Sequence, residues 1–143
     1  MGRFFASECG AYLTRVIDTK VNCGTAYAIL DGGIHHVNYL GGNMGMRVPI
    51  IRQSSVREGE MQPWALCGSL CTTADVLVRK AELHPLDQGD ILAFMNIGAY
   101  SVTEGPALFL SRDMPSIILH GKGGDRLARS AVHSWELNHE GER

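Results

Sequence analysis

The sequence predicts a small, mainly β domain, built as a barrel or a sandwich with one short helix near its C-terminus. Three observations predict it. Apolar and polar residues alternate over residues 11–22, glycine-rich turns separate many short expected strands, and helical spacing is confined to one late segment. Many short strands separated by turns are typical of such all-β folds. At 143 residues the chain has the length of one domain with a single core.

The chain is predicted to open with an antiparallel hairpin. Residues 11–22 (AYLTRVIDTKVN) alternate apolar and polar side chains and include β-branched residues, as a half-buried strand does. A Cys-Gly dipeptide supplies the turn, and residues 25–30 (TAYAIL) form the returning strand. Residues 31–33 (DGG) end that strand, and three glycines make 41–46 a loop.

Later segments give shorter strands and the helix. Pro49 restricts residues 47–52 (RVPIIR) to an edge strand, because proline cannot donate to a central ladder. Residues 125–137 (DRLARSAVHSWEL) form the predicted helix, with an aspartate at the capping position and apolar residues four apart. The other expected elements are a buried segment at 61–70, a turn at 84–90, and strands at 91–100, 107–110 and 116–121.

Composition excludes several classes of function. The net charge of −2, without a basic stripe, argues against a nucleic-acid partner. No apolar run approaches the roughly 20 residues that span a membrane, and the N-terminus lacks the order of a signal peptide. Four cysteines without a secretory signal predict reduced thiols in the cytoplasm.

The segment CGSLCTTAD (67–75) holds two cysteines four positions apart. Zinc requires four ligands, and a second pair is missing because the other two cysteines are far apart. The adjacent His35 and His36 would point to opposite faces of a strand. A redox pair needs C-x-x-C at the start of a helix, whereas this spacing is C-x-x-x-C. The sequence therefore predicts no metal site and no redox pair.

The two cysteines differ in their surroundings. Cys67 lies inside an apolar run, where a free cysteine is usually a small buried hydrophobe. Cys71 follows the end of that run, where a strand gives way to a loop. Loops on a rigid scaffold often present reactive groups. Cys71 is thus the better candidate for chemistry.

Several stretches in this order match the motifs of one family. Residues 2–7 (GRFFAS) match G-R-x-x-V-A, and residues 28–36 (AILDGGIHH) match a strand that ends in D-x-G. Residues 66–77 (LCGSLCTTADVL) match G-P-x-C-E-x-x-D, and residues 88–100 (QGDILAFMNIGAY) match G-D-x-x-x-x-x-x-x-G-A-Y. A looser match, to Y-N-x-x-x-x-P, lies at 109–115 (FLSRDMP). Together they resemble the pyridoxal-phosphate-dependent decarboxylases of diaminopimelate, ornithine and arginine, which share fold type III. The resemblance covers about residues 1 to 120.

This resemblance implies that residues 1–143 form the Greek-key antiparallel β-barrel at the C-terminus of a decarboxylase. Family members join that barrel to an N-terminal (β/α)₈ domain, which carries the lysine that binds pyridoxal 5'-phosphate as a Schiff base. They act as head-to-tail homodimers with active sites at the subunit interface. Lys20, Lys80 and Lys122 match no cofactor-lysine motif. We therefore expect this chain alone to be inactive.

The resemblance also assigns roles to individual residues. The cofactor withdraws electrons from the reacting carbon, which must be protonated after carbon dioxide leaves. Cys71 matches the cysteine that supplies this proton, as a catalytic acid. Arg3 and Tyr100 match the arginine and tyrosine that bind the cofactor phosphate, and forked guanidinium donors suit a phosphate. Arg47 matches an arginine that holds a substrate carboxylate.

One departure from the family concerns the substrate. The acidic residue after the family's cysteine, which meets the distal amino group of a diamine-type substrate, is Thr72 here. A hydroxyl group cannot neutralise an ammonium group. The loop is more similar to the C-T-x-x-D loop of relatives that act on other amino acids, including glutamate tethered to a carrier protein. Thr72 and Asp75 are predicted to contact substrate, with a turn cap as the alternative role for Asp75.

Two other functions stay open from the sequence. A fold type III racemase shares the two-domain architecture, but its barrel contributes a catalytic tyrosine and the cysteine loop would have no role. A stand-alone binding or interaction module would keep the barrel without the chemistry. The decarboxylase, a carbon-carbon lyase acting on a small amino acid, explains more of the motifs.

Overall fold

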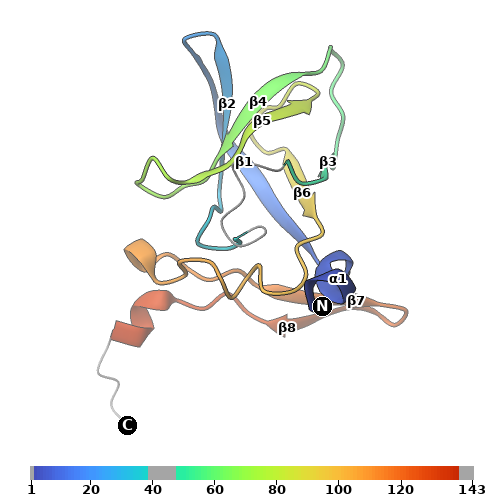
Figure 1. Cartoon of the computed structure of the whole chain (residues 1–143), viewed down its shortest axis with the longest axis vertical. Helices are drawn as coiled ribbons and strands as arrows, with labels where there is room; N and C mark the ends of the chain where they lie inside the picture. The colour runs from blue at the N-terminus through green and yellow to red at the C-terminus, as the bar shows by residue number, and fades with distance from the viewer. Residues whose placement is uncertain (1, 39–47, 139–143) are drawn as a thin grey trace. The chain divides into compact units, whose positions relative to one another are not determined.

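The described residues, 2–38 and 48–138, fall into two units in the computed structural model, one ending at Gly105 and the other starting at Pro106 (Figure 1). The first unit holds a six-stranded sheet and the second a two-stranded hairpin. Besides strands, the described part contains one five-residue α-helix and short 3-10 turns. The predicted mainly β fold is therefore confirmed.

One long strand sets the course of the six-stranded sheet. β1 (Ala11–Asn22) pairs with β6 (Ile91–Met95) along its first part and with β2 (Thr25–Leu30) along the rest. A bulge between Val16 and Asp18 lies where the second pairing begins. Because a bulge bends a strand and increases its twist, β1 carries the sheet around a corner (Figure 1).

The sheet has the order β3-β6-β1-β2-β4-β5 and curls into a half-barrel. Its remaining strands are β3 (Ile51–Gln53), β4 (Gln62–Cys67) and β5 (Val76–Leu83). Neighbours are antiparallel except for β2 and β4, which run parallel. β3 lies at one end of the order, as predicted for the strand at 47–52, but it begins at Ile51, after Pro49.

The concave side of this sheet holds the core. In β1 the side chains of Tyr12, Thr14 and Val16 are buried, while the residues between them are exposed. Phe94 and Leu92 of β6 are fully buried opposite them. The same cluster includes apolar residues of β2, β4 and β5: Ala26, Ala28, Leu30, Trp64, Leu66, Leu77, Val78, Ala81 and Leu83.

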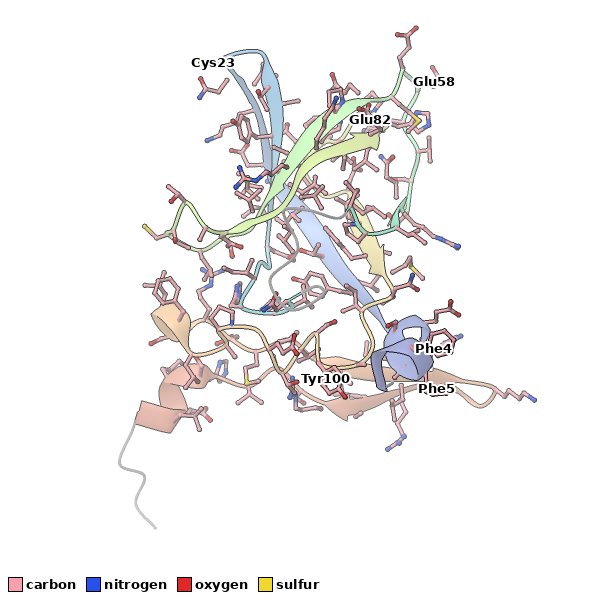
Figure 2. All side chains as sticks on the ribbon, viewed as in Figure 1. Phe4, Phe5, Cys23, Glu58, Glu82 and Tyr100 are labelled. Carbon is pink, nitrogen blue, oxygen red and sulfur yellow. The ribbon has the colours of Figure 1, made fainter. Side chains whose placement is uncertain are left out.

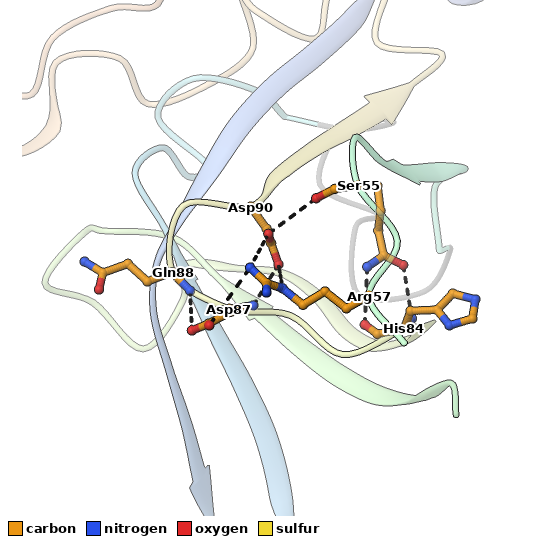
Figure 3. A network of polar contacts seen from close by, with 7 residues as sticks. Ser55, Arg57, His84, Asp87, Gln88 and Asp90 are labelled. Carbon is orange, nitrogen blue, oxygen red and sulfur yellow. Dashed lines mark hydrogen bonds and ion pairs between the residues drawn. The ribbon is translucent and has the colours of Figure 1, made fainter. Parts of the chain in front are cut away.

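A network of polar contacts fixes the turn at 84–90, which leads into β6 (Figure 3). The buried carboxylate of Asp90 accepts two hydrogen bonds from the Arg57 guanidinium, each 2.9 Å long, and one of 2.8 Å from the Asp87 N–H. The hydrogen bonds from Arg57 are the main reason that the pKa of Asp90 is lowered. At the start of the turn, the Gln53 side chain forms two hydrogen bonds with the backbone of His84.

The predictions for the first unit were accurate in the hairpin and weaker elsewhere. Residues 11–22 and 25–30 form strands with the expected bounds. The strand predicted at 91–100 ends at Met95, because the next residue, Asn96, adopts a positive φ angle of 60°. β5 and the N-terminal helix α1 (Gly2–Ala6) were not predicted. The predicted loop at 41–46 lies outside the described residues.

The second unit corrects two predictions. The helix expected at 125–137 is wrong: β8 (Gly124–Arg129) pairs with β7 (Ile117–Gly121), and only the 3-10 turn η4 (Ser134–Asn138) follows. Three apolar residues at helical spacing are too few to overcome the cost of starting a helix when a tight turn allows strand pairing. The strand expected at 107–110 is also wrong, since η3 (Phe109–Ser111) forms there. Among the described residues, no helix has the length and apolar character that crossing a membrane requires.

Candidate functional site

The loop between β4 and β5 presents one thiol and shields another. Cys71 is exposed in this loop, whereas Cys67 is half-buried at the end of β4. Burial is the main cause of a raised pKa for the Cys67 thiol, and the nearby Asp75 carboxylate adds to it. All four cysteines of the chain are free. The predicted contrast between the two thiols agrees with their exposure.

A buried carboxylate organises the cysteine loop (residues 67–75). Asp75 is 2% exposed, and its Oδ2 accepts a 2.8 Å hydrogen bond from the Leu70 N–H, next to Cys71. Its Oδ1 accepts a 2.9 Å hydrogen bond from the Ile34 N–H, in a segment far away in sequence. The backbone oxygen of Asp75 accepts a further bond from the Gly68 N–H. This geometry matches the turn cap, the alternative role for Asp75, and joins two loops.

Two glycines leave room for this carboxylate. A Cβ atom at Gly33 would lie 2.5 Å from both Asp75 side-chain oxygens. A Cβ atom at Gly68 would approach the same oxygens more closely still. Real Cβ atoms essentially never come within 3.0 Å of such atoms. The glycines of the DGG and CGS motifs are therefore required by the position of Asp75.

The DGG segment holds the cysteine loop from the other side. Asp31 Oδ1 accepts hydrogen bonds from the Thr14 hydroxyl (2.6 Å) and the Arg15 N–H (2.9 Å), which fixes the segment to β1. Ser69 then donates twice to the segment, from its N–H to the Gly32 carbonyl and from its hydroxyl to the Asp31 carbonyl, both 3.0 Å. The cysteine loop is thus held at Ser69 and Leu70, directly before Cys71.

The adjacent histidines differ from expectation. His35 and His36 lie in a turn rather than a strand, so their rings are not on opposite faces: the ring centroids are 4.0 Å apart. His35 is buried, and His36 Nδ1 lies 2.9 Å from the Tyr12 hydroxyl. Burial is the main cause of a raised pKa for Tyr12, which keeps its hydroxyl protonated. No group of three metal-ligating side chains is present among the described residues.

Thr72 lies directly after the exposed thiol and is half-buried. Its hydroxyl accepts a hydrogen bond of 3.2 Å from the Ala74 N–H, and its backbone oxygen accepts one of 3.2 Å from the Asp75 N–H. Such hydroxyl-to-backbone bonds stabilise tight turns. Thr72 therefore helps to shape the loop, and its contact with substrate stays a prediction.

A second candidate region joins α1 to the turn at 97–100. A Cβ atom at Gly2 would lie 2.7 Å from the Tyr100 hydroxyl oxygen, so the start of the chain and this tyrosine are in close contact. The Gly98 N–H donates to the Ser7 carbonyl at 2.9 Å, which holds the turn to the segment after α1. Tyr100 is 54% exposed, and Figure 2 shows it at the opposite end of the first unit from Cys23.

Both residues predicted to bind the cofactor phosphate, Arg3 and Tyr100, belong to this region. Arg3 belongs to α1, next to Gly2, although its side chain lies outside the described part. Tyr100 has a φ of 72° and the preceding Ala99 a φ of 30°. Such backbone strain in residues other than glycine is common at ligand sites. Arg47, predicted to hold a substrate carboxylate, lies outside the described residues.

Sequence reasoning missed the segment that connects these two regions. Residues 31–38 contact the cysteine loop through Gly32 and Ile34, as described above. At its other end, the Asn38 N–H donates to the Ser101 carbonyl (2.7 Å) and the Asn38 side chain donates to the Glu104 carbonyl (3.2 Å). The DGG motif marked the end of a strand and one match to the family, but it predicted none of these contacts. Its tertiary contacts depend on loops that are remote in sequence.

The family model and the similar proteins of known function all indicate the same family. Residues 4–98 match the family model described as pyridoxal-dependent decarboxylase, C-terminal sheet domain. The chain is 31% identical over 135 residues to the L-glutamyl-[BtrI acyl-carrier protein] decarboxylase of Niallia circulans, covering 90% of this chain and 31% of that protein. It is 27% identical over 128 residues to the diaminopimelate decarboxylase of Methanocaldococcus jannaschii, covering 90% and 28%.

Solved structures give the same result for the fold. The crystal structure of the M. jannaschii diaminopimelate decarboxylase has a TM-score of 0.85 at 25% identity, covering 99% of this chain and 32% of that one. Its co-complex with L-lysine has a TM-score of 0.84. This chain spans about a third of the length of these relatives.

Proposed function

The chain belongs to the pyridoxal-dependent decarboxylase family, as its C-terminal sheet domain, and on this premise we propose that Cys71 is the catalytic acid of an amino-acid decarboxylase. The observation that carries the proposal is an exposed thiol on a loop fixed from both sides. Cys67, four residues earlier, is half-buried and its thiol pKa is raised, so it is a poorer source of a proton.

The proposed step moves one proton. When carbon dioxide leaves, the electron pair of the broken carbon-carbon bond stays on the substrate carbon. The Cys71 S–H bond breaks, its proton forms a new C–H bond at that carbon, and the thiolate takes up a proton from water. A positioned acid of this kind contributes about 10²–10⁴-fold to the rate.

The described residues fit a cofactor that carries a phosphate. Tyr100 is 54% exposed, and its hydroxyl oxygen would lie 2.7 Å from a Cβ atom at Gly2. We propose that this hydroxyl and the Arg3 guanidinium bind the phosphate of pyridoxal 5'-phosphate. The cofactor, when bound, withdraws electrons from the reacting carbon. The lysine that anchors it would come from an N-terminal domain, and the whole enzyme would act as a cytoplasmic homodimer.

The substrate is proposed to be an amino acid without a distal ammonium group. Thr72 follows the catalytic thiol, and its hydroxyl accepts an N–H bond within the loop, so it brings no negative charge to this position. The N. circulans relative is named for a glutamyl group on an acyl-carrier protein. Glutamate tethered to a carrier protein is therefore the first substrate to test, with Arg47 proposed to hold a carboxylate.

The test uses the full-length protein, meaning this chain together with a lysine-bearing N-terminal domain. We expect carbon dioxide release with cofactor and carrier-tethered glutamate, and much less with lysine or diaminopimelate. This chain alone, with the same additions, should release no carbon dioxide above a blank. Release by the isolated chain, or none from the full-length protein with any amino acid, would contradict the proposal.

A further inference from the structure

We propose that Asp75 is a positioning residue for Cys71. Its buried carboxylate fixes the backbone next to the thiol against the segment 31–34, and it acts through Cys71 without contacting the substrate. This inference rests on the proposed role of Cys71 and assigns a function to a side chain that the chemistry itself does not use.

Asp75 and Cys71 differ in burial. At 2% exposure the Asp75 side chain is not available to a substrate, while Cys71, four residues earlier, is exposed. A buried carboxylate needs compensating hydrogen bonds, and Asp75 receives one on each oxygen, from Leu70 and from Ile34. Both donors are backbone N–H groups, so the carboxylate determines where two loops lie.

The hydrogen bonds at Leu70 restrain the backbone on both sides of Cys71. The Leu70 N–H lies one residue before Cys71, and the Leu70 side chain is buried. The Thr72 N–H donates to the Leu70 carbonyl at 2.8 Å, so the residue after the thiol is also tied to Leu70. Fixing Leu70 therefore fixes both neighbours of Cys71. A displacement of about 1 Å of a reacting group can lower a rate by about 10²-fold.

Both loops leave space for the Asp75 carboxylate. Gly33 and Gly68 face it from the two loops that it joins, and a methyl group on either one would overlap its oxygens. Two independent backbone segments thus accommodate one side chain. The arrangement also predicts that Gly33→Ala displaces the carboxylate without changing Asp75 itself.

The first test is a double-mutant cycle on turnover and products in the full-length protein. Asparagine keeps the size of Asp75 but turns an amide N–H₂ toward one of the two N–H donors. We expect Asp75→Asn to lower kcat by about 10- to 100-fold with little change in KM, and to raise the share of errant transamination products. In a Cys71→Ala background the same substitution should have no further effect, because the thiol it positions is gone.

The matched control is Asp90→Asn. Asp90 is also buried and accepts a backbone N–H, but in the turn at 84–90. The substitution Asp90→Asn should lower the melting temperature without changing the product ratio, with or without Cys71→Ala. The positioning role would be overturned if Asp75→Asn and Asp90→Asn changed the product ratio equally. It would also be overturned if Asp75→Asn had its full effect in the Cys71→Ala background.

The second test does not depend on enzyme activity. In this chain, the Ile34 and Leu70 amides lie in loops, yet both donate to the buried carboxylate. Their hydrogen exchange, measured by NMR, should be about 10- to 100-fold slower than that of the exposed Thr73 amide in the same loop, and Gly33→Ala should remove the difference. Equal exchange rates in the wild-type chain would refute the restraint. Slow exchange together with an inactive full-length protein would refute the proposed function alone.

Discussion

The cysteine loop (67–75) and the turn at 84–90 each contain a buried aspartate whose carboxylate accepts backbone N–H hydrogen bonds, two at Asp75 and one at Asp90. They differ in what else the aspartate meets. Asp90 also accepts two hydrogen bonds from Arg57, so its charge is paired. The donors to Asp75 are backbone N–H groups of two loops. The charged pair stabilises a turn, whereas the Asp75 bonds fix the backbone on which an exposed thiol is carried.

The largest effect should come from removing that thiol. Cys71→Ala in the full-length protein takes away the proposed proton donor, and we expect turnover to fall by about 10²–10⁴-fold, with more transaminated cofactor among the products. Steady-state kinetics with product analysis measures both.

Cys23→Ala is the matched control for this substitution. Cys23 is also exposed, at the tip of the β1–β2 hairpin (Figure 2). Its replacement should leave rate and products unchanged. Unchanged turnover in Cys71→Ala would show that protonation depends on another group.

The next largest effect concerns the paired aspartate. Asp90→Ala leaves the Asp87 N–H without its acceptor and removes the carboxylate that accepts both hydrogen bonds from Arg57, so we expect a loss of about 1–3 kcal/mol in the free energy of unfolding. Urea unfolding of this chain measures it. Lys80→Ala, which breaks an exposed ion pair with Glu82, should cost less than about 0.5 kcal/mol. Equal losses in the two variants would mean that the 84–90 network adds no stability.

The same pair should make stability depend on pH. The pKa of Asp90 is lower in the folded protein than in the unfolded chain, where an aspartate has a pKa of about 3.9. Its contribution is therefore present above that unfolded value and is lost as the pH falls through the folded pKa. Urea midpoints measured from pH 6 down to pH 3 should fall more steeply in the wild type than in Asp90→Asn. Parallel curves would rule out this source of acid sensitivity.

The sequence predicted local features of both regions and missed their tertiary contacts. The bounds of the β1–β2 hairpin were predicted correctly. The sequence patterns of residues 11–22 and 25–30 and the Cys-Gly turn between them all favour this one structure. The cysteine loop was located by its motif, and the greater exposure of Cys71 was expected from its place after an apolar run.

The missed features depend on residues that are distant in sequence. Neither the bond from Ile34 to Asp75 nor the close approach of Gly2 to Tyr100 leaves a local pattern. The wrong helix at 125–137 shows the opposite error. There a local pattern existed, but pairing with β7 determined the structure.

The smallest effect separates the two thiols of the cysteine loop by stability. Cys67 is half-buried at the end of β4, between partners in β2 and β5, and we expect Cys67→Ala to cost about 1 kcal/mol in the free energy of unfolding. Cys71→Ala removes an exposed side chain and should stay within about 0.5 kcal/mol of the wild type. Urea unfolding of both variants of this chain gives the comparison. Iodoacetamide labelling at pH 8, followed residue by residue by mass spectrometry, should also modify Cys67 more slowly, because burial raises its pKa and limits access. If Cys71→Ala proved the more destabilising, or Cys67 the faster to react, the assignment of one structural and one reactive thiol would be reversed.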